Sequence, residues 1–141
     1  SRCITFKIHF SFDETVNICN QILNQNILNE LNHDLINYYC TPGEIIKLVQ
    51  FAEEKQINLK DHDVSSIISL IIENTYYKKN IFIKNLLINF IELFLLKRYK
   101  TSNNKNFLLN FYQSFIQKIN NTEKFNLDEE SLFLEFKSKI L

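Results

Sequence analysis

The chain has 141 residues, of which 45% are hydrophobic and 23% are charged, and its 16 basic and 16 acidic residues cancel. This composition is that of a globular chain and not of a disordered one, and the length is enough for one helical domain or two small ones with a buried core. Divided at residue 60, the first part carries 5 basic and 7 acidic residues and the rest carries 11 and 9. Neither −2 nor +2 provides the basic stripe of a tight nucleic-acid binder, so a DNA-contacting role for this chain by itself is disfavoured.

Cysteine usage and hydropathy indicate a cytoplasmic protein. The three cysteines, Cys3, Cys19 and Cys40, are far apart and odd in number, as in a reducing compartment. No apolar signal-peptide segment is visible near the start, and the missing initiator Met suggests a truncated chain. The most apolar segment, 81–96, is too short and too often interrupted by polar residues to span a membrane. We therefore expect no membrane partner.

Residues 1–10 have the alternation of a β-strand, with Ile4, Phe6 and Ile8 on one face. A single strand is not stable alone, so its partner strands must belong to a missing part of the protein or to another chain. We therefore expect a remnant of a core strand here. The competing interpretation is a tail that packs against the helices.

Residues 11–58 are predicted to form a three-helix domain. Ser11 and Glu14 make a capping box for the first helix, whose apolar stripe includes Cys19 as a small core residue. A second helix is expected after residues 24–26, with Leu28, Leu31, Leu35 and Tyr38 on one side. Thr41 then opens a third helix as its N-cap, with Pro42 at the first helical position and Glu44 completing a capping box.

Residues 59–141 are predicted to form a second bundle of four to five helices, so the fold class is all-α. A helix starting at Asp61 or Asp63 is expected to end near residues 78–79, and the next one, 81–100, is apolar on most sides and therefore central. A further helix is expected to break at 120–122, and acidic residues 128–130 suit the first turn of the last one. Some apolar residues of the last two helices are expected to remain exposed for neighbouring subunits, among Phe107, Phe111, Phe133 and Phe136. The alternative is that all four are internal.

Two short motifs carry a resemblance to a known family. Ser1-Arg2-Cys3 precedes the strand-like segment, and Cys40-Thr41-Pro42-Gly43 follows some forty residues later at a helix start. Together, and in this order, they resemble the clamp-loader branch of the AAA+ ATPases. The resemblance implies a remnant of the ATPase core (1–10), a helical lid (11–58) and a helical collar that holds a subunit ring (59–141).

The resemblance also implies roles for single residues. The arginine of the triplet, Arg2, would be the catalytic residue that reaches a neighbouring subunit's ATP. Gly43 stands where the family's ATP-sensing arginine would be, and a Pro-Gly there is most similar to the delta-prime type of bacterial DNA polymerase III subunit. No phosphate loop is present, since Gly43 is the only glycine, so we expect no ATPase activity and no cofactor in this chain. The implied partners are the other loader subunits and, through the whole complex, the sliding clamp and primer-template DNA.

Other interpretations remain open. The chain could instead belong to the ATP-hydrolysing gamma/tau type, against which Gly43 argues, or be an unrelated helical adaptor that packs as one continuous bundle. A small helical enzyme has no nucleophile-base constellation to support it. Metal binding is not expected either, because His9, His33 and His62 are scattered and no cysteine has a close partner. The segment Asp61-His62-Asp63 is better explained by N-capping than by a metal site.

Overall fold

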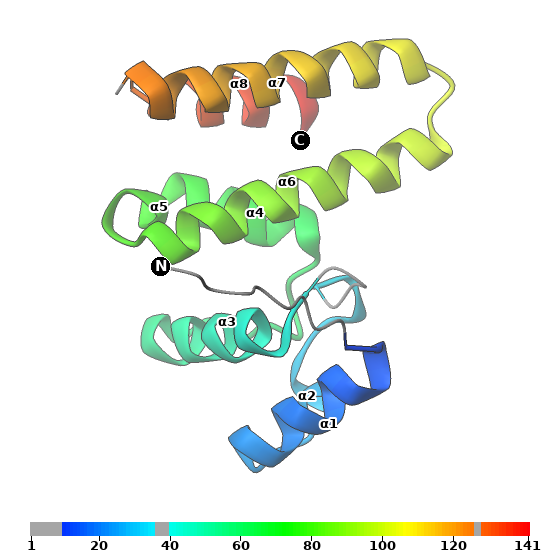
Figure 1. Cartoon of the computed structure of the whole chain (residues 1–141), viewed down its shortest axis with the longest axis vertical. Helices are drawn as coiled ribbons and strands as arrows, with labels where there is room; N and C mark the ends of the chain where they lie inside the picture. Colours follow the sequence, from blue (N-terminus) through cyan, green and yellow to red (C-terminus); the bar gives the residue numbers. More distant parts are fainter. Residues whose placement is uncertain (1–9, 36–39, 126–127) are drawn as a thin grey trace, which may run out of the picture. The chain divides into compact units, whose positions relative to one another are not determined.

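The computed structural model describes residues 10–35, 40–125 and 128–141, and within these ranges all regular structure is helical (Figure 1). The predicted all-α fold class is therefore confirmed for the described residues. The chain divides into two compact units, unit 1 from Ser1 to Asp63 and unit 2 from Val64 to Leu141. The expected strand lies outside the described residues except for Phe10, and the assignment of the units as lid and collar remains a prediction.

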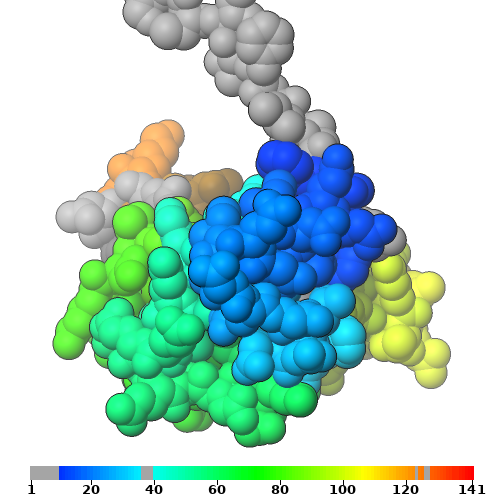
Figure 2. All heavy atoms as spheres, turned by 90° about the horizontal axis from the view of Figure 1, so that it is seen from below, coloured from blue at the N-terminus to red at the C-terminus, as the bar shows by residue number. Residues whose placement is uncertain are grey.

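Unit 1 contains α1 (Phe12–Leu23), α2 (Ile27–Glu30), a 3-10 helix η1 (His33–Leu35) and α3 (Pro42–Lys55). α1 packs on α2 and α3, and the space-filling view shows its blue atoms lying against the cyan and green part of this unit (Figure 2). The core consists of apolar side chains that are less than a tenth exposed: Val16, Cys19, Ile27, Leu31, Leu35, Ile45, Leu48, Val49, Phe51, Ala52 and Leu59.

The prediction of one continuous second helix in unit 1, with Leu28, Leu31, Leu35 and Tyr38 on one side, is wrong. α2 has only four residues, and Leu31 is already extended at φ −108° and ψ 142°. Asn26 caps the start of α2 by accepting a hydrogen bond from the Leu28 N–H, whereas Asn32 accounts for the interruption, because its side chain accepts a hydrogen bond from the Asp34 N–H just after α2 ends. Such local bonds offer the backbone an alternative to the helical ladder. Residues 36–39 lie outside the described part.

Unit 2 contains α4 (Val64–Glu73), α5 (Tyr76–Lys79), α6 (Ile81–Thr101), α7 (Lys105–Phe125) and α8 (Glu130–Ile140). α6 packs against α4, α5 and α7, and the prediction that this helix is central is therefore confirmed. It runs antiparallel to α7, to which a short turn connects it at one end (Figure 1). Seven of its residues are buried, on a broad face that leaves an exposed stripe with Asn85, Asn89 and Leu96: Ile83, Leu86, Leu87, Phe90, Ile91, Leu93 and Leu95.

Two helix boundaries in unit 2 differ from the prediction. The helix expected to reach residues 78–79 ends as α4 at Glu73, since the Asn74 amide donates to the Leu70 carbonyl and Thr75 takes a left-handed φ of 52°. The break expected at 120–122 does not occur, and α7 continues to Phe125. The buried Thr122 hydroxyl donates to the Ile119 carbonyl at 2.7 Å, so this residue is satisfied inside the helix.

α8 closes the core of unit 2 with two phenylalanines, so the expectation that Phe133 and Phe136 are exposed is wrong. Both side chains have an exposed fraction of 0%. The Phe136 ring lies 5.6 Å from the Phe115 ring and 6.1 Å from the Phe111 ring between centroids. Aromatic pairs at such separations add to the stabilisation that burial alone provides. Phe107 remains exposed and Phe111 is half-buried.

Ion pairs surround α8 outside this aromatic core. Glu135 accepts hydrogen bonds from Lys118 of α7 and Lys139 of its own helix, and these two ammonium groups lower the pKa of its carboxyl to about 2. Lys137 pairs with Glu73 of α4. Because exposed pairs of this kind contribute about 0–1 kcal/mol each, the buried rings supply most of the stabilisation of α8.

Candidate functional site

The start of α3 carries the second of the two motifs, and side-chain hydrogen bonds cap this helix end. The Thr41 Oγ1 accepts a hydrogen bond from the Glu44 N–H at 3.2 Å, while Glu44 Oε2 accepts from the Thr41 N–H at 2.7 Å. Pro42 at the first helical position has no N–H to satisfy. The predicted capping box is confirmed, and it occupies N–H groups of the kind that hold phosphate in many nucleotide sites.

Gly43 lies in this first turn without any conformational reason to be glycine. Its φ is not in the positive range. A Cβ at this position would have one near neighbour, the Thr41 Oγ1 at 4.0 Å, which is an ordinary contact distance. A larger side chain would therefore fit here, so the missing charge at Gly43 is a property of the sequence and not a demand of the backbone.

Gly43→Ala should accordingly stabilise unit 1, by about 0.5–1 kcal/mol, because alanine loses less backbone freedom than glycine on entering a helix. The free energy of unfolding from urea titration measures this change. Ala52→Gly, in a buried position of the same helix, is the opposite control and should destabilise. A loss of stability in Gly43→Ala would mean that the fold needs glycine at this position after all.

Of the other residues singled out in the sequence, Cys19 lies in the described part of the chain and the first motif does not. Ser1, Arg2 and Cys3 lie outside the described residues, so Arg2 stays a prediction. Cys19 is fully buried and its Sγ lies 3.6 Å from the Pro42 carbonyl oxygen. Burial raises the pKa of the Cys19 thiol, which disfavours the reactive thiolate and fits the predicted role as a small core residue.

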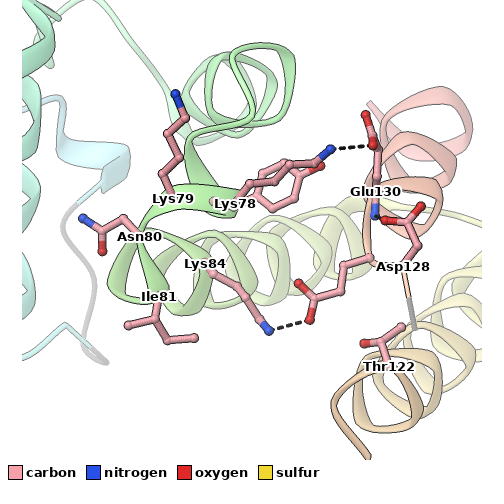
Figure 3. Close-up of a pocket in the computed structure, with 10 residues that line it drawn as sticks. Lys78, Lys79, Asn80, Ile81, Lys84, Thr122, Asp128 and Glu130 are labelled. Carbon is pink, nitrogen blue, oxygen red and sulfur yellow. Dashed lines mark hydrogen bonds and ion pairs between the residues drawn. The ribbon is translucent and has the colours of Figure 1, made fainter. Parts of the chain in front are cut away.

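Unit 2 has a polar groove of about 720 Å³ beside the N-terminal end of α6 (Figure 3). Three segments build it: α5 with the first turn of α6, α7 near its end, and the residues that lead into α8. The lining residues are Tyr77, Lys78, Lys79, Asn80, Ile81, Lys84, Thr122, Asp128, Glu129 and Glu130.

Ion pairs across this groove connect segments that are far apart in the sequence. Lys78 pairs with Glu130 at 2.5 Å, and Lys84 pairs with Glu129. The second pair is the more buried, with side chains that are 13% and 20% exposed, against 44% and 42% in the first. Figure 3 shows both lysines extending toward the acidic residues, whereas Lys79 extends away from them. These contacts fix the start of α8 on the α5–α6 corner.

The groove offers no arrangement for covalent catalysis. Its charged side chains largely neutralise one another, and the Thr122 hydroxyl is already bonded to the Ile119 carbonyl. Sequence reasoning did not find this site, because its ion pairs join residues 45 and 52 positions apart. The only sequence signal was the acidic run 128–130, which was assigned to the first turn of a helix.

Histidines and acidic residues do not assemble into a metal site in the described ranges, where no three potential ligands come together. His62 has a buried Nδ1 without a hydrogen-bond partner. Asp61 accepts a hydrogen bond from the Asn58 side-chain amide at 2.5 Å, so it stabilises the preceding turn, and Asp63 directly precedes α4. Among the helices that the structure describes, none is both long and apolar enough to cross a membrane.

Comparisons with protein-family models, with curated proteins and with solved structures give no match to this chain.

Proposed function

We propose that the chain is the lid and collar part of a clamp-loader subunit of the delta-prime type, acting in the cytoplasm as part of a DNA polymerase III holoenzyme. Its work would be structural: the collar holds a ring of related subunits, and the lid transmits ATP-driven rearrangements. The proposal rests on the resemblance of two motifs and on the geometry of one of them.

The start of α3 is the observation that carries the proposal. A nucleotide-sensing helix needs free N–H groups or a cation near the phosphates. Here the capping box occupies the N–H groups of Thr41 and Glu44, and Gly43 supplies no cation although a side chain would fit. This arrangement supports a subunit that does not sense its own ATP, and it argues against the gamma/tau type.

Exposed apolar residues of unit 2 support the collar role. Ile81 at the start of α6 and Phe125 at the end of α7 are 68% and 60% exposed. Both helix ends lie on the same side of the antiparallel α6–α7 pair (Figure 1). A contiguous exposed apolar patch is typical of a surface that another subunit covers, and we infer that these two side chains belong to one. We therefore assign the subunit contact to Ile81 and Phe125 at this end of unit 2, next to the polar groove that Ile81 also lines, and we call these two residues the apolar end.

Assembly tests the proposal. The protein is co-expressed with the other loader subunits of its own organism, and the mass of the purified complex is measured by native mass spectrometry. We expect stoichiometric incorporation, and we expect the double variant Ile81→Asp, Phe125→Asp to lose it. The matched control Leu96→Asp, Leu109→Asp, at the other end of the same two helices, should still assemble.

Two outcomes would contradict the proposal. If the unmodified protein stays apart from every loader subunit, the clamp-loader assignment is wrong. If the complex forms but the control variant loses assembly and the apolar-end variant does not, the contact surface has been assigned to the wrong end. Circular dichroism of each variant shows that the helices are retained.

A further inference from the structure

The two units carry opposite net charges. Unit 1 contains 5 basic and 9 acidic residues, a net charge of −4, and unit 2 contains 11 and 7, a net charge of +4. The neutral total therefore conceals two oppositely charged units. A single-sign charge matters for binding only if it is concentrated, so its distribution within unit 2 decides what it can do.

The acidic residues of unit 2 are gathered around α8 and the groove. The described carboxylates that form ion pairs with lysines are Glu73, Glu129, Glu130 and Glu135. Glu92 accepts a hydrogen bond from the Tyr112 hydroxyl. The next acidic residue after Glu92 is Glu123, so residues 93–122 contain no acid at all, but they contain five basic residues. The positive charge of unit 2 is thus concentrated on the α6–α7 hairpin.

The α6–α7 turn places cations and aromatic rings together. The Lys105 ammonium lies 5.5 Å from the centre of the Tyr99 ring. This contact joins the last turn of α6 to the first turn of α7. Arg98 lies over the Phe94 ring and also donates to the Ile140 carbonyl. Among the ion pairs of the described residues, none involves Arg98, Lys100 or Lys105.

The rings at this turn are open to solvent. Tyr99 is 38% exposed and Phe107 is 48% exposed, and exposed asparagines lie between them. We call Arg98, Tyr99, Lys100, Lys105 and Phe107 the basic-aromatic turn. It lies at the opposite end of the α6–α7 pair from Ile81 and Phe125 (Figure 1).

We propose that the basic-aromatic turn binds single-stranded nucleic acid. Arg98, Lys100 and Lys105 supply cations for backbone phosphates, and Tyr99 and Phe107 supply flat apolar faces on which unpaired bases stack. An acidic peptide would use the cations but leave the two rings without a partner of matching shape. The proposal goes beyond the structural role assigned above and does not depend on it, because the apolar end and the basic-aromatic turn are different surfaces.

Binding of a fluorescent oligothymidylate of about 16 nucleotides to the full chain tests the proposal by anisotropy. We expect saturable binding with Kd of about 10⁻⁴–10⁻⁶ M near physiological salt, weakening as salt increases. The variant Lys100→Gln, Lys105→Gln should bind about tenfold more weakly, and the magnitude of its salt slope should fall by about 1.4, because two phosphate contacts are lost. The matched control Lys79→Gln, Lys124→Gln removes two exposed lysines away from the turn, one in α5 just before α6 and one near the end of α7, and should bind as the unmodified chain does.

The aromatic residues are tested separately from the charges. Tyr99→Leu, Phe107→Leu keeps apolar bulk but removes the stacking faces, and it should weaken oligonucleotide binding at least fivefold at about 1 kcal/mol or more per base. Binding of inorganic polyphosphate, which has no bases, should be the same in this variant and in the unmodified chain.

Three results would overturn the proposal. One is the absence of saturable oligonucleotide binding up to about 10⁻⁴ M at low salt. Another is equal weakening in the lysine variant and its matched control, which would mean that charge acts without regard to position. The third is preferential binding to vesicles of anionic phospholipid with no binding of the oligonucleotide, which would identify a membrane surface instead. None of these results bears on assembly with loader subunits, so the two proposals fail independently.

Discussion

Phe136→Ala is expected to destabilise unit 2 by about 3–5 kcal/mol, which is much of the stability that a domain of this size has. The Phe136 ring is fully buried and lies within 6.3 Å of the Phe94, Phe111 and Phe115 rings. Truncation removes these contacts and leaves a cavity that rigid neighbouring rings cannot fill. Urea unfolding followed by circular dichroism measures the change.

The matched control for this variant is Leu134→Ala in the same helix. The Leu134 side chain is 50% exposed, so its truncation should change the free energy of unfolding by no more than about 0.5 kcal/mol. If Phe136→Ala lowered the free energy of unfolding by no more than Leu134→Ala does, α8 would not pack through the face that carries Phe136. Such a result would also restore the earlier expectation that this residue faces other subunits.

Arg2→Ala should slow ATP hydrolysis at the neighbouring site of the assembled loader by about 10³-fold, if the proposed function is correct. A guanidinium stabilises the charge that develops on the transferred phosphoryl group, and its planar fork contacts two oxygens at once. Clamp-stimulated ATPase activity of the full-length complex measures the effect. The effect concerns the rate alone, so the complex should assemble normally.

Arg2→Lys separates charge from geometry in this experiment. Lysine keeps the positive charge but not the fork, so we expect it to restore only part of the rate. Lys55→Ala, at the end of α3, is a charge-removing control away from the motif and should leave the rate unchanged. An unchanged rate in Arg2→Ala would remove this residue from the mechanism.

Helix starts were predictable from the sequence because they depend on neighbouring residues. Ser11 with Glu14 and Thr41 with Glu44 form the expected capping boxes, in which each side chain satisfies a backbone N–H three residues away. The central place of α6 was also predictable, since a helix that is apolar on most sides needs neighbours on most sides.

Helix interruptions were harder to predict in a chain rich in asparagine. Asn32 and Asn74 bond to nearby backbone groups and accompany ends of helices, whereas Asn120 and Asn121 are exposed inside α7 and leave it intact. The difference lies in what each side chain meets, which the residue type alone does not specify. The packing of Ile119 and Thr122 against the core is sufficient to carry α7 past its two asparagines.

The candidate sites were less accessible to sequence reasoning than the helices. The periodicity of α8 showed that Phe133 and Phe136 share a face, but not whether that face meets the same chain or another one. The pairs Lys78–Glu130 and Lys84–Glu129 depend on how α8 returns to the α5–α6 corner. The charge separation was underestimated because a division at residue 60 leaves Asp61 and Asp63 with the basic part.

The position of α8 in the chain has a consequence for synthesis on the ribosome. Unit 1 precedes unit 2, so its core can form while most of unit 2 has not yet been translated. The other helices of unit 2 leave the exit tunnel before α8, and until then the Phe111 and Phe115 rings lack the Phe136 ring that covers them. Nascent chains of this protein should therefore expose an aromatic surface that attracts chaperones until α8 emerges.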